Sequence, residues 1–326
     1  MAGQMFHTDV GRRVYDNMAL LFPRSCPYRM MRIGGNTDGA YLIPDDLSGV
    51  AACFSPGVAN FKWFEDELAN LGIRCHMADF SSDADRLATP LMSGMQTFLK
   101  KWISPDPAEN SISIDDWVNQ LEPGEDDLLL QMDIEGAEYP NLLSVSEAVL
   151  RRFRILVLEL HDIQVCHAAG EFLSRIAPVI QRISMFFQTV HVHVNNVGGS
   201  ERIDGTGLEV PRIIEVTLLR KDRFPSAGHA DWRQPVIPHP LDLDVNCPHI
   251  APLCLSEEWC LSEESRQDWK QSAADVYGRK AGLTLFEVQE RIKHLELENV
   301  SLRRRLDELS LLSRMLRFGK KMRQMF

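Results

Sequence analysis

Residues 128–138 read LLLQMDIEGAE, an apolar run that ends abruptly in acidic residues and a glycine. The apolar part is typical of a buried parallel strand. The acids Asp133, Glu135 and Glu138 follow directly, and an apolar core does not tolerate unpaired charges. Either the strand delivers these acids into a ligand crevice at the carboxyl end of an open α/β sheet, or it ends in a solvated acidic turn. This stretch alone leaves both interpretations open.

The flanking sequence alternates between strand and helix patterns. Strands are predicted at residues 50–55, 73–78, 128–132, 154–160, 189–194 and 210–220. Helices are predicted at residues 61–71, 111–121, 139–152 and 169–187, the last with a kink at Pro178. This alternation predicts an α/β fold with a mainly parallel, doubly wound sheet and helices on both faces.

Composition narrows the class of protein. The chain has 326 residues and a net charge of −11, and an acidic protein of this kind should repel nucleic acid. Seven scattered cysteines without a CxxC pair favour a reducing cytoplasm. No apolar run is long enough to span a bilayer, and residues 1–13 lack the apolar segment of a secretion signal. We therefore expect a cytoplasmic protein.

The end of the chain has the most regular periodicity. After a proline-rich, irregular segment at 224–280, residues 281–326 are predicted to form a coiled-coil helix with a basic tail. Apolar residues recur three and four apart over 285–316, and Asn299 occupies an a position, which favours a parallel homodimer. The alternative is a single amphipathic helix packed on the rest of the chain. The basic tail could lie on the inner face of an anionic membrane or be solvated.

A turn and an acid further upstream are typical of nucleoside binding. Ser55, Gly57 and Val58 lie in a tight turn between a predicted strand and helix. Asp79 ends the second strand 22 residues after Gly57, near the spacing at which an acid accepts hydrogen bonds from ribose hydroxyls. The alternative for Asp79 is a local cap before the Ser81 turn. Only one glycine of the dinucleotide fingerprint is present.

Together these motifs resemble the FkbM-type S-adenosylmethionine-dependent methyltransferases. The resemblance covers roughly residues 30–223, so we assign 1–223 to this domain, with an N-terminal extension at about 1–45. The matching segments are FSPGV (54–58), FEDELA (64–69), ADFS (78–81), QMDIEGAE (131–138), LELH (158–161), RIGG (32–35), DGAYLIP (38–44), HVHVNN (191–196) and TLLRKDR (217–223). The most specific of them is 131–138.

The resemblance implies a Rossmann-like, seven-stranded methyltransferase sheet and S-adenosyl-L-methionine as the cofactor. Its implied cofactor-binding residues are Ser55, Gly57, Val58, Asp79, Phe80 and Asp133. Asp133 and Glu135 are expected to face the transferred methyl group and the acceptor, and His161 to act as the base. The acceptor is expected to be a small molecule or a glycan with a hydroxyl group. The reduced glycine loop and Val194, where one branch of the family has proline, depart from the family pattern.

The histidines leave alternatives open. His161 could accept a proton from an alcohol or only cap the end of its strand. His191 and His193 share one face of a strand and could bind a divalent metal with Asp133 or His161. Paired histidines are more often packed and hydrogen-bonded, so we predict no metal ligands. Two other functions remain: a degenerate methyltransferase scaffold that acts through its coiled coil, and a nicotinamide-dependent oxidoreductase.

Overall fold

The computed structural model describes residues 9–203, 208–225, 232–243, 246–247, 249–250 and 252–269. The chain divides into two compact units, 1–273 and 274–326. The predicted coiled coil at 285–316 and the basic tail fall outside the described residues, and so do parts of the irregular segment at 224–280. Among the described residues, no helix combines the length and the apolar character needed to cross a membrane.

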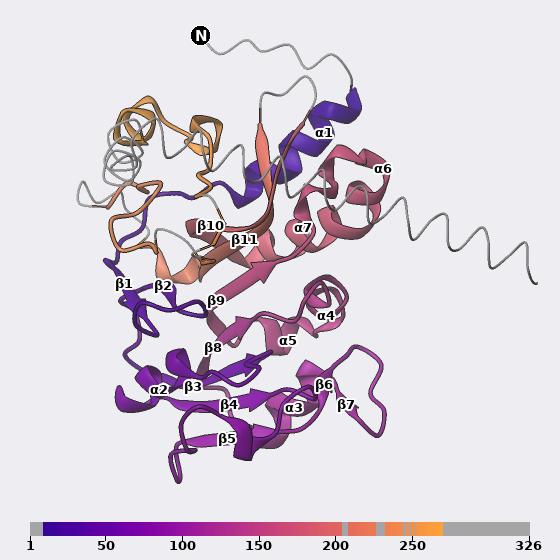
Figure 1. Cartoon of the computed structure of the whole chain (residues 1–326), viewed down its shortest axis with the longest axis vertical. Helices are drawn as coiled ribbons and strands as arrows, with labels where there is room; N and C mark the ends of the chain where they lie inside the picture. The colour runs from indigo at the N-terminus through magenta and orange to yellow at the C-terminus, as the bar shows by residue number, and fades with distance from the viewer. Residues whose placement is uncertain are drawn as a thin grey trace, which may run out of the picture. The chain divides into compact units, whose positions relative to one another are not determined.

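A seven-stranded mixed sheet forms the centre of the first unit, in the order β10-β11-β9-β8-β3-β4-β5 (Figure 1). Its strands are β3 (Val50–Pro56), β4 (Arg74–Ala78), β5 (Gln96–Leu99), β8 (Asp127–Met132), β9 (Phe153–Leu160), β10 (Phe187–Arg202) and β11 (Glu209–Arg220). Strand β11 is antiparallel to both β9 and β10, whereas the run from β9 to β5 is parallel. The predicted α/β class with a mainly parallel sheet is confirmed.

Helices cover both faces of the sheet. They are α1 (Asp9–Met18), α2 (Trp63–Asn70), α3 (Ile114–Leu121), α4 (Glu138–Ser144), α5 (Glu147–Leu150), α6 (Ala169–Glu171) and α7 (Ala177–Phe186). Short helical turns are η1 (Ala19–Leu21), η2 (Ala84–Arg86), η3 (Ile163–His167), η4 (Phe172–Ile176), η5 (Lys221–Arg223) and η6 (Glu257–Trp259). Two small strand pairs lie outside the main sheet: β1 (Met30–Ile33) with β2 (Tyr41–Pro44), and β6 (Trp102–Ile103) with β7 (Ser111–Ile112).

Alternating residues of the central strands point into two separate cores, as the two-residue period of a strand requires. Phe54 and Leu130 join the core beneath α1, α3, α4, α5 and α7. Their neighbours Cys53 and Leu129 join the core beneath α2 and the β1–β2 hairpin. Figure 1 shows α2 and this hairpin on one side of the sheet and α3, α4 and α7 on the other. The result is a three-layer arrangement.

The order of the strands determines where a ligand can bind. From β3 the chain builds outward through β4 and β5, and then returns to place β8 on the other side of β3. Loops leaving β3 and β8 therefore diverge to opposite faces, which leaves a crevice between the two strand ends. In open α/β sheets, ligands bind at such a switch point, outside the carboxyl ends of the strands.

Two predicted helices are shorter than expected. The helix predicted at 61–71 begins at Trp63 and ends at Asn70, and Phe61 and Leu71 are 60% and 53% exposed. It stops there because Gly72 adopts a φ of +87°, a left-handed conformation that typically terminates helices. The helix predicted at 111–121 begins only at Ile114, since Ser111–Ile112 form β7 and the Ser113 side chain caps the helix.

Two long helices are interrupted. The helix predicted at 139–152 is two helices, α4 and α5, because Val145 is extended and the Ser146 side chain caps α5 by accepting the Val149 N–H. The segment predicted as a helix at 169–187 is helical but contains the π-helical turn η4 directly before α7. Pro178, in the first turn of α7, lacks an N–H, and a wider turn accommodates its ring.

Candidate functional site

A cavity of about 400 Å³ opens at the switch point, where β3, β8 and β9 end. Five of the residues predicted from the sequence line it. Gly57 and Val58 come from the end of β3, Asp133 and Glu135 from the end of β8, and His161 from the end of β9. Residues that are up to 104 positions apart in the sequence (57 to 161) thus share one space. The structure therefore brings these five predicted residues together at one edge of the sheet.

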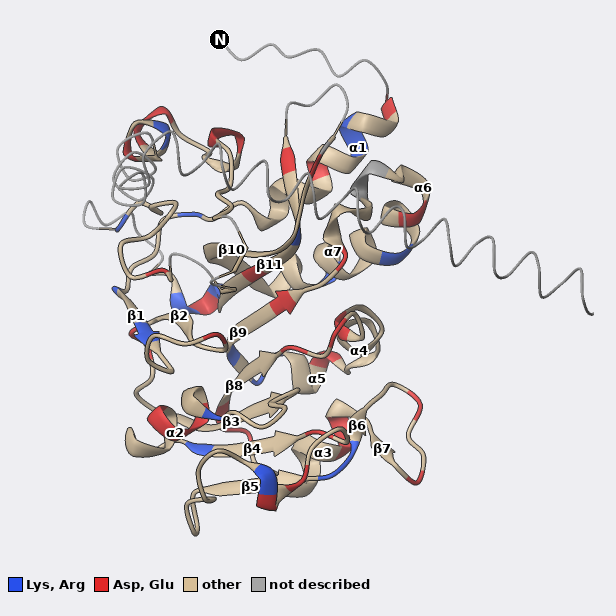
Figure 2. Cartoon of the chain, viewed as in Figure 1, with Lys and Arg blue, Asp and Glu red and all other residues tan. Residues whose placement is uncertain are grey.

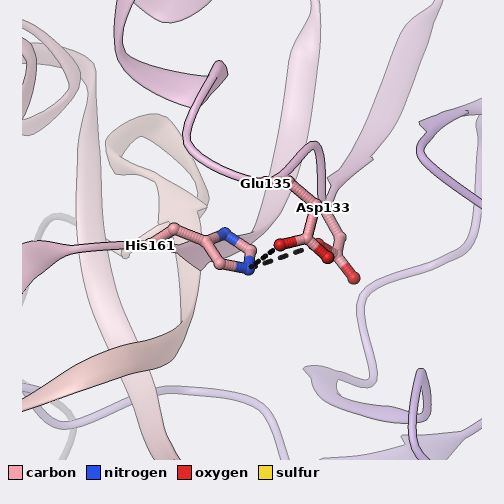
Figure 3. Close-up of side chains that lie close together, drawn as sticks. All are labelled: Asp133, Glu135 and His161. Carbon is pink, nitrogen blue, oxygen red and sulfur yellow. Dashed lines mark ion pairs between the residues drawn. The ribbon is translucent and has the colours of Figure 1, made fainter. Parts of the chain in front are cut away.

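Carboxylates surround the His161 ring (Figure 3). Its Nε2 atom lies 3.4 Å from Glu135 Oε2 and 3.8 Å from Asp133 Oδ1. The same atom lies 4.0 Å from Glu159 Oε1, and on the other side of the ring Nδ1 lies 3.0 Å from Glu138 Oε1. Figure 2 shows acidic residues at the end of β9 and between β8 and α4. Within the described part of the chain, no Lys or Arg forms an ion pair with these four acids.

A tight turn after β8 places the acids. Glu135 and Gly136 both have positive φ, +56° and +98°, and the Ala137 N–H donates to the Ile134 carbonyl. Two successive positive φ values are typical of a type I′ turn, in which the chain reverses within four residues. The reversal brings the fully buried Glu138 back beneath the turn, where its Oε1 accepts the N–H groups of Ile134 and Gly136, each at 3.1 Å. These two hydrogen bonds hold the Glu138 carboxylate in the position from which it contacts His161.

The charge cluster shifts the pKa of its members. Burial raises the pKa of Asp133 to about 7; the His161 imidazole opposes this shift and the carboxylates of Glu135 and Glu138 add to it. For His161, burial lowers the pKa, but the hydrogen bond with Glu138 and the surrounding carboxylates outweigh burial and raise it above its ordinary value. The cluster therefore retains a positive charge on the imidazole more readily than an isolated histidine does.

Gly57 is required by a close approach of two strand ends. With a φ of +88°, a Cβ atom at this position would lie 1.5 Å from the carbonyl oxygen of Asp133. The Gly57 N–H donates to the Ala78 carbonyl, and the Asp133 N–H donates to the Pro56 carbonyl. Gly57 thus joins the ends of β3, β4 and β8, and the lack of a side chain is what lets the cavity form there.

Asp79 and Phe80 do not line the cavity. Asp79 Oδ2 accepts the Ala59 N–H at 2.7 Å, and Oδ1 accepts both the N–H and the hydroxyl of Ser81. The local turn that was the alternative for Asp79 is thus formed, while Oδ2 keeps one lone pair that a ribose hydroxyl could use. Phe80 packs against Trp102, with ring centroids 5.4 Å apart.

Ser55 lies fully buried beneath the cavity and belongs to a hydrogen-bonded network that crosses the cavity floor. Ser55 Oγ contacts Glu65 Oε1 and lies 2.6 Å from Gln131 Oε1. The Gln131 amide contacts the Tyr41 hydroxyl at 3.3 Å, and this hydroxyl contacts Glu159 Oε2 at 3.4 Å. This network thus links two buried acids, Glu65 and Glu159, across the cavity floor.

A count of protons shows that one of these acids is neutral. This hydrogen-bonded network has four contacts. The Ser55 and Tyr41 hydroxyls donate one proton each, and the Gln131 amide donates one in either orientation, so the network has only three donors. The fourth proton must come from Glu65 or Glu159. Burial raises the pKa of both, that of Glu65 to about 7, so a neutral acid here is consistent with the surroundings.

His191 and His193 do not join the cavity cluster, so their grouping with Asp133 or His161 is wrong. They face Asp242 instead, with nitrogen–oxygen distances of 2.9 Å and 3.5 Å. The His191 ring is close but not aligned for a hydrogen bond. Asp242 lies in the proline-rich segment, which the sequence pattern did not connect with β10.

No role was predicted for Tyr41 and Glu65, which line the cavity, or for Glu138, which lies fully buried beneath the turn after β8. Glu138 belongs to the acidic stretch, and its place three residues after Glu135 is a usable signal. Glu65 lies on the buried face of α2 between Phe64 and Leu68, an unusual place for an acid. Tyr41 comes from the β1–β2 hairpin and gave no signal beyond the resemblance.

Comparisons with known proteins add no family assignment. No protein-family model matches this chain, and no curated protein matches it.

Proposed function

We propose that this chain is an S-adenosylmethionine-dependent O-methyltransferase that acts on a hydroxyl of a small-molecule or saccharide acceptor. The observation that carries the proposal is the shared cavity of about 400 Å³, bordered by Gly57, Asp133 and His161 from three strand ends. The sheet supports the same function, since seven strands with a switch point beside the first strand are what the resemblance to FkbM-type enzymes implies.

The charge of the cavity suits a sulfonium cofactor. Asp133, Glu135 and Glu159 line it, and their carboxylates attract a cation while offering nothing to a phosphate. The pyrophosphate of a nicotinamide cofactor would instead be repelled by these acids. The electrostatics of the cavity therefore favour methyl transfer over hydride transfer.

The arrangement also suits the chemistry of methyl transfer. The reaction is an in-line displacement, so alignment of the acceptor oxygen, the methyl carbon and the sulfur supplies much of the rate. An alcohol is a poor nucleophile until its proton is removed. His161 Nε2 faces the cavity and can accept that proton, while Glu138 holds the ring through Nδ1.

Thermal unfolding with added ligands tests the cofactor. S-adenosylhomocysteine at about 100 times its dissociation constant should stabilise the protein by about 2.7 kcal/mol, which raises Tm by about 5 °C. Stabilisation by NAD instead would indicate an oxidoreductase, and stabilisation by neither would favour a non-catalytic scaffold. Transfer of a radiolabelled methyl group to the carbohydrate fraction of a cell extract then tests the acceptor class.

We further propose a cytoplasmic homodimer, joined through residues 285–316, whose basic tail contacts the inner face of a membrane. The support is the heptad pattern with Asn299 at an a position. Replacing Leu295 and Leu302 by Asp should yield monomers in analytical ultracentrifugation of the full chain. A dimer that survives both changes would mean that other surfaces associate.

A further inference from the structure

We propose that Asp133, Glu135 and His161 together bind one divalent metal cation in the cavity. One oxygen of each carboxylate and one ring nitrogen of His161 all lie within 4.8 Å of one another. Figure 3 shows the three side chains converging, with the carboxylates facing the ring nitrogen. The proposal does not depend on methyl transfer, because metal binding can be measured without cofactor or acceptor.

The orientation of His161 is what points to a metal. Its Nδ1 contacts Glu138 at 3.0 Å, and because Glu138 accepts two backbone N–H groups with the same oxygen, the ring nitrogen must be the donor. In the neutral imidazole Nε2 then carries the lone pair. It belongs to a side chain that is more than nine-tenths buried, and it faces Asp133 and Glu135. Histidines that bind metals typically donate their other ring N–H to a carboxylate in this way.

The carboxylates around Nε2 attract a positive charge, which either a proton on the ring or a bound metal ion can supply. The distances of 3.4 Å and 3.8 Å to Glu135 and Asp133 are too long for strong hydrogen bonds. A lone pair that faces two carboxylates is repelled by them unless a positive charge lies between. Two ligands of a first-row divalent ion, each about 2.1 Å from the metal, lie about 3.0–3.4 Å apart in neighbouring positions. Small side-chain rotations would therefore bring the three ligand atoms around one ion.

The ligands and the access path indicate the class of ion. One imidazole and two carboxylates suit Mn²⁺ or a related first-row ion, with Mg²⁺ bound more weakly through the carboxylates. The Glu135 side chain is 87% exposed, so an ion can enter from solvent, and the open cavity leaves coordination positions for a substrate oxygen. A mixed site of this kind can both hold an ion and present it to a ligand.

A bound ion would change the part played by His161 in the proposed reaction. Nε2 cannot hold a metal and accept a proton at the same time. The cation would instead bind the acceptor hydroxyl and lower its pKa, so that the proton can leave to solvent or to a neighbouring carboxylate. This consequence rests on the proposed function, whereas the metal site itself does not.

Titration of the full chain with Mn²⁺, followed by the electron paramagnetic resonance signal of the free ion, tests the proposal. We expect one Mn²⁺ per chain at pH 7.5 in the absence of cofactor and acceptor. Glu135→Gln should weaken binding at least tenfold, and because this side chain is exposed, the variant should remain folded. Glu138→Gln, which touches no metal, should weaken binding about 10–100-fold by releasing the ring.

Asp162→Asn is the matched control. Asp162 follows His161 directly and has a positive φ of +53°, close to the +56° of Glu135. It lies outside the cluster, in an ion pair with Arg212. Its replacement removes one negative charge nearby and should leave the affinity for Mn²⁺ unchanged. The absence of stoichiometric binding to the wild-type chain would mean that a proton alone balances the cluster, and would overturn the proposal. Binding that is unaffected by both Glu135→Gln and Asp133→Asn would overturn it too.

Discussion

Two clusters of histidine and carboxylate side chains in the described part of the chain differ in charge balance and in access. The cavity cluster has four carboxylates within 4.0 Å of the single His161 ring, and it opens to solvent. In the second cluster, His191 and His193 face the single carboxylate of Asp242, and all three side chains are at least nine-tenths buried. Excess negative charge with access indicates a ligand site, whereas balanced charge without access indicates a structural ion pair.

The pKa shifts follow the same division. Burial raises the pKa of Asp242, but the two histidines outweigh burial and hold it well below its usual range. For His193, burial lowers the pKa, but Asp242 and Glu215 raise it to about 9. His193 and Asp242 are thus both ionised and paired with each other at neutral pH. In the cavity cluster, burial and, to a smaller extent, the neighbouring carboxylates raise the pKa of Asp133 to about 7.

The largest expected effect is on turnover. In the proposed reaction, Asp133→Asn should lower the rate of methyl transfer about 10²–10⁴-fold, because the charge that this proposal places next to the methyl group is lost. The fold should remain, since this side chain borders the cavity and is 28% exposed. Initial rates with labelled cofactor, together with Tm, would check this. A rate close to that of the wild type would exclude Asp133 from the reacting centre.

The second cluster should show the opposite behaviour. Asp242→Asn leaves the protonated His193 buried without its partner, and breaking a buried ion pair costs about 3–5 kcal/mol. Urea unfolding should show this loss, while the folded fraction at low temperature keeps the wild-type rate of methyl transfer. Unchanged stability would mean that the cluster is not an ion pair, and a loss of turnover in the folded protein would join the two clusters functionally.

Glu65, on the cavity floor, should make stability depend on pH. Its pKa rises from 4.5 in the unfolded chain to about 7 in the folded one, so the stability it contributes is complete below pH 4.5 and is lost as pH rises through 7. The total loss is about 3 kcal/mol. Glu65→Gln mimics the neutral acid and can donate to Ser55, so it should flatten this part of the pH profile. Urea unfolding from pH 4 to 8 measures both proteins, and identical profiles would contradict the protonated acid.

The smallest expected effect is the difference in stability between alanine substitutions at two glycines with the same backbone conformation. Gly57 and Gly72 have φ of +88° and +87°, but a Cβ atom would meet the Asp133 carbonyl at Gly57 and nothing within 4 Å at Gly72. Gly72→Ala should cost about 1–2 kcal/mol for its positive φ alone. Gly57→Ala should cost a further 1–3 kcal/mol, roughly, and weaken binding of S-adenosylhomocysteine. Equal losses would show that the strand ends are free to separate.

The sequence predicted the parts of the site that follow from strand ends. The carboxyl ends of parallel strands meet at one edge of a sheet, so Gly57, Asp133 and His161 could be placed together from the strand pattern alone. Contacts between distant, irregular segments leave no such periodic signal. The meeting of His193 with Asp242 depends on a segment without regular structure, and the role of Glu138 depends on a reversal within four residues that Glu135 enters with a positive φ.

Helix boundaries were the weaker part of the fold prediction. Apolar spacing predicted one helix across 139–152, but it does not detect two non-helical residues such as Val145 and Ser146, which divide the segment. The role of Asp79 was ambiguous for a similar reason. An acid before serine can serve a ligand or its own turn, and the structure shows the turn contacts to Ala59 and Ser81.

A crystal structure of the full chain grown with S-adenosylhomocysteine and Mn²⁺ tests the central claim most directly. The account predicts the cofactor product in the cavity beside Gly57, and an anomalous Mn²⁺ peak within about 2.4 Å of Asp133, Glu135 and His161. Ligand density at any other surface, with water alone between these three side chains, would contradict it.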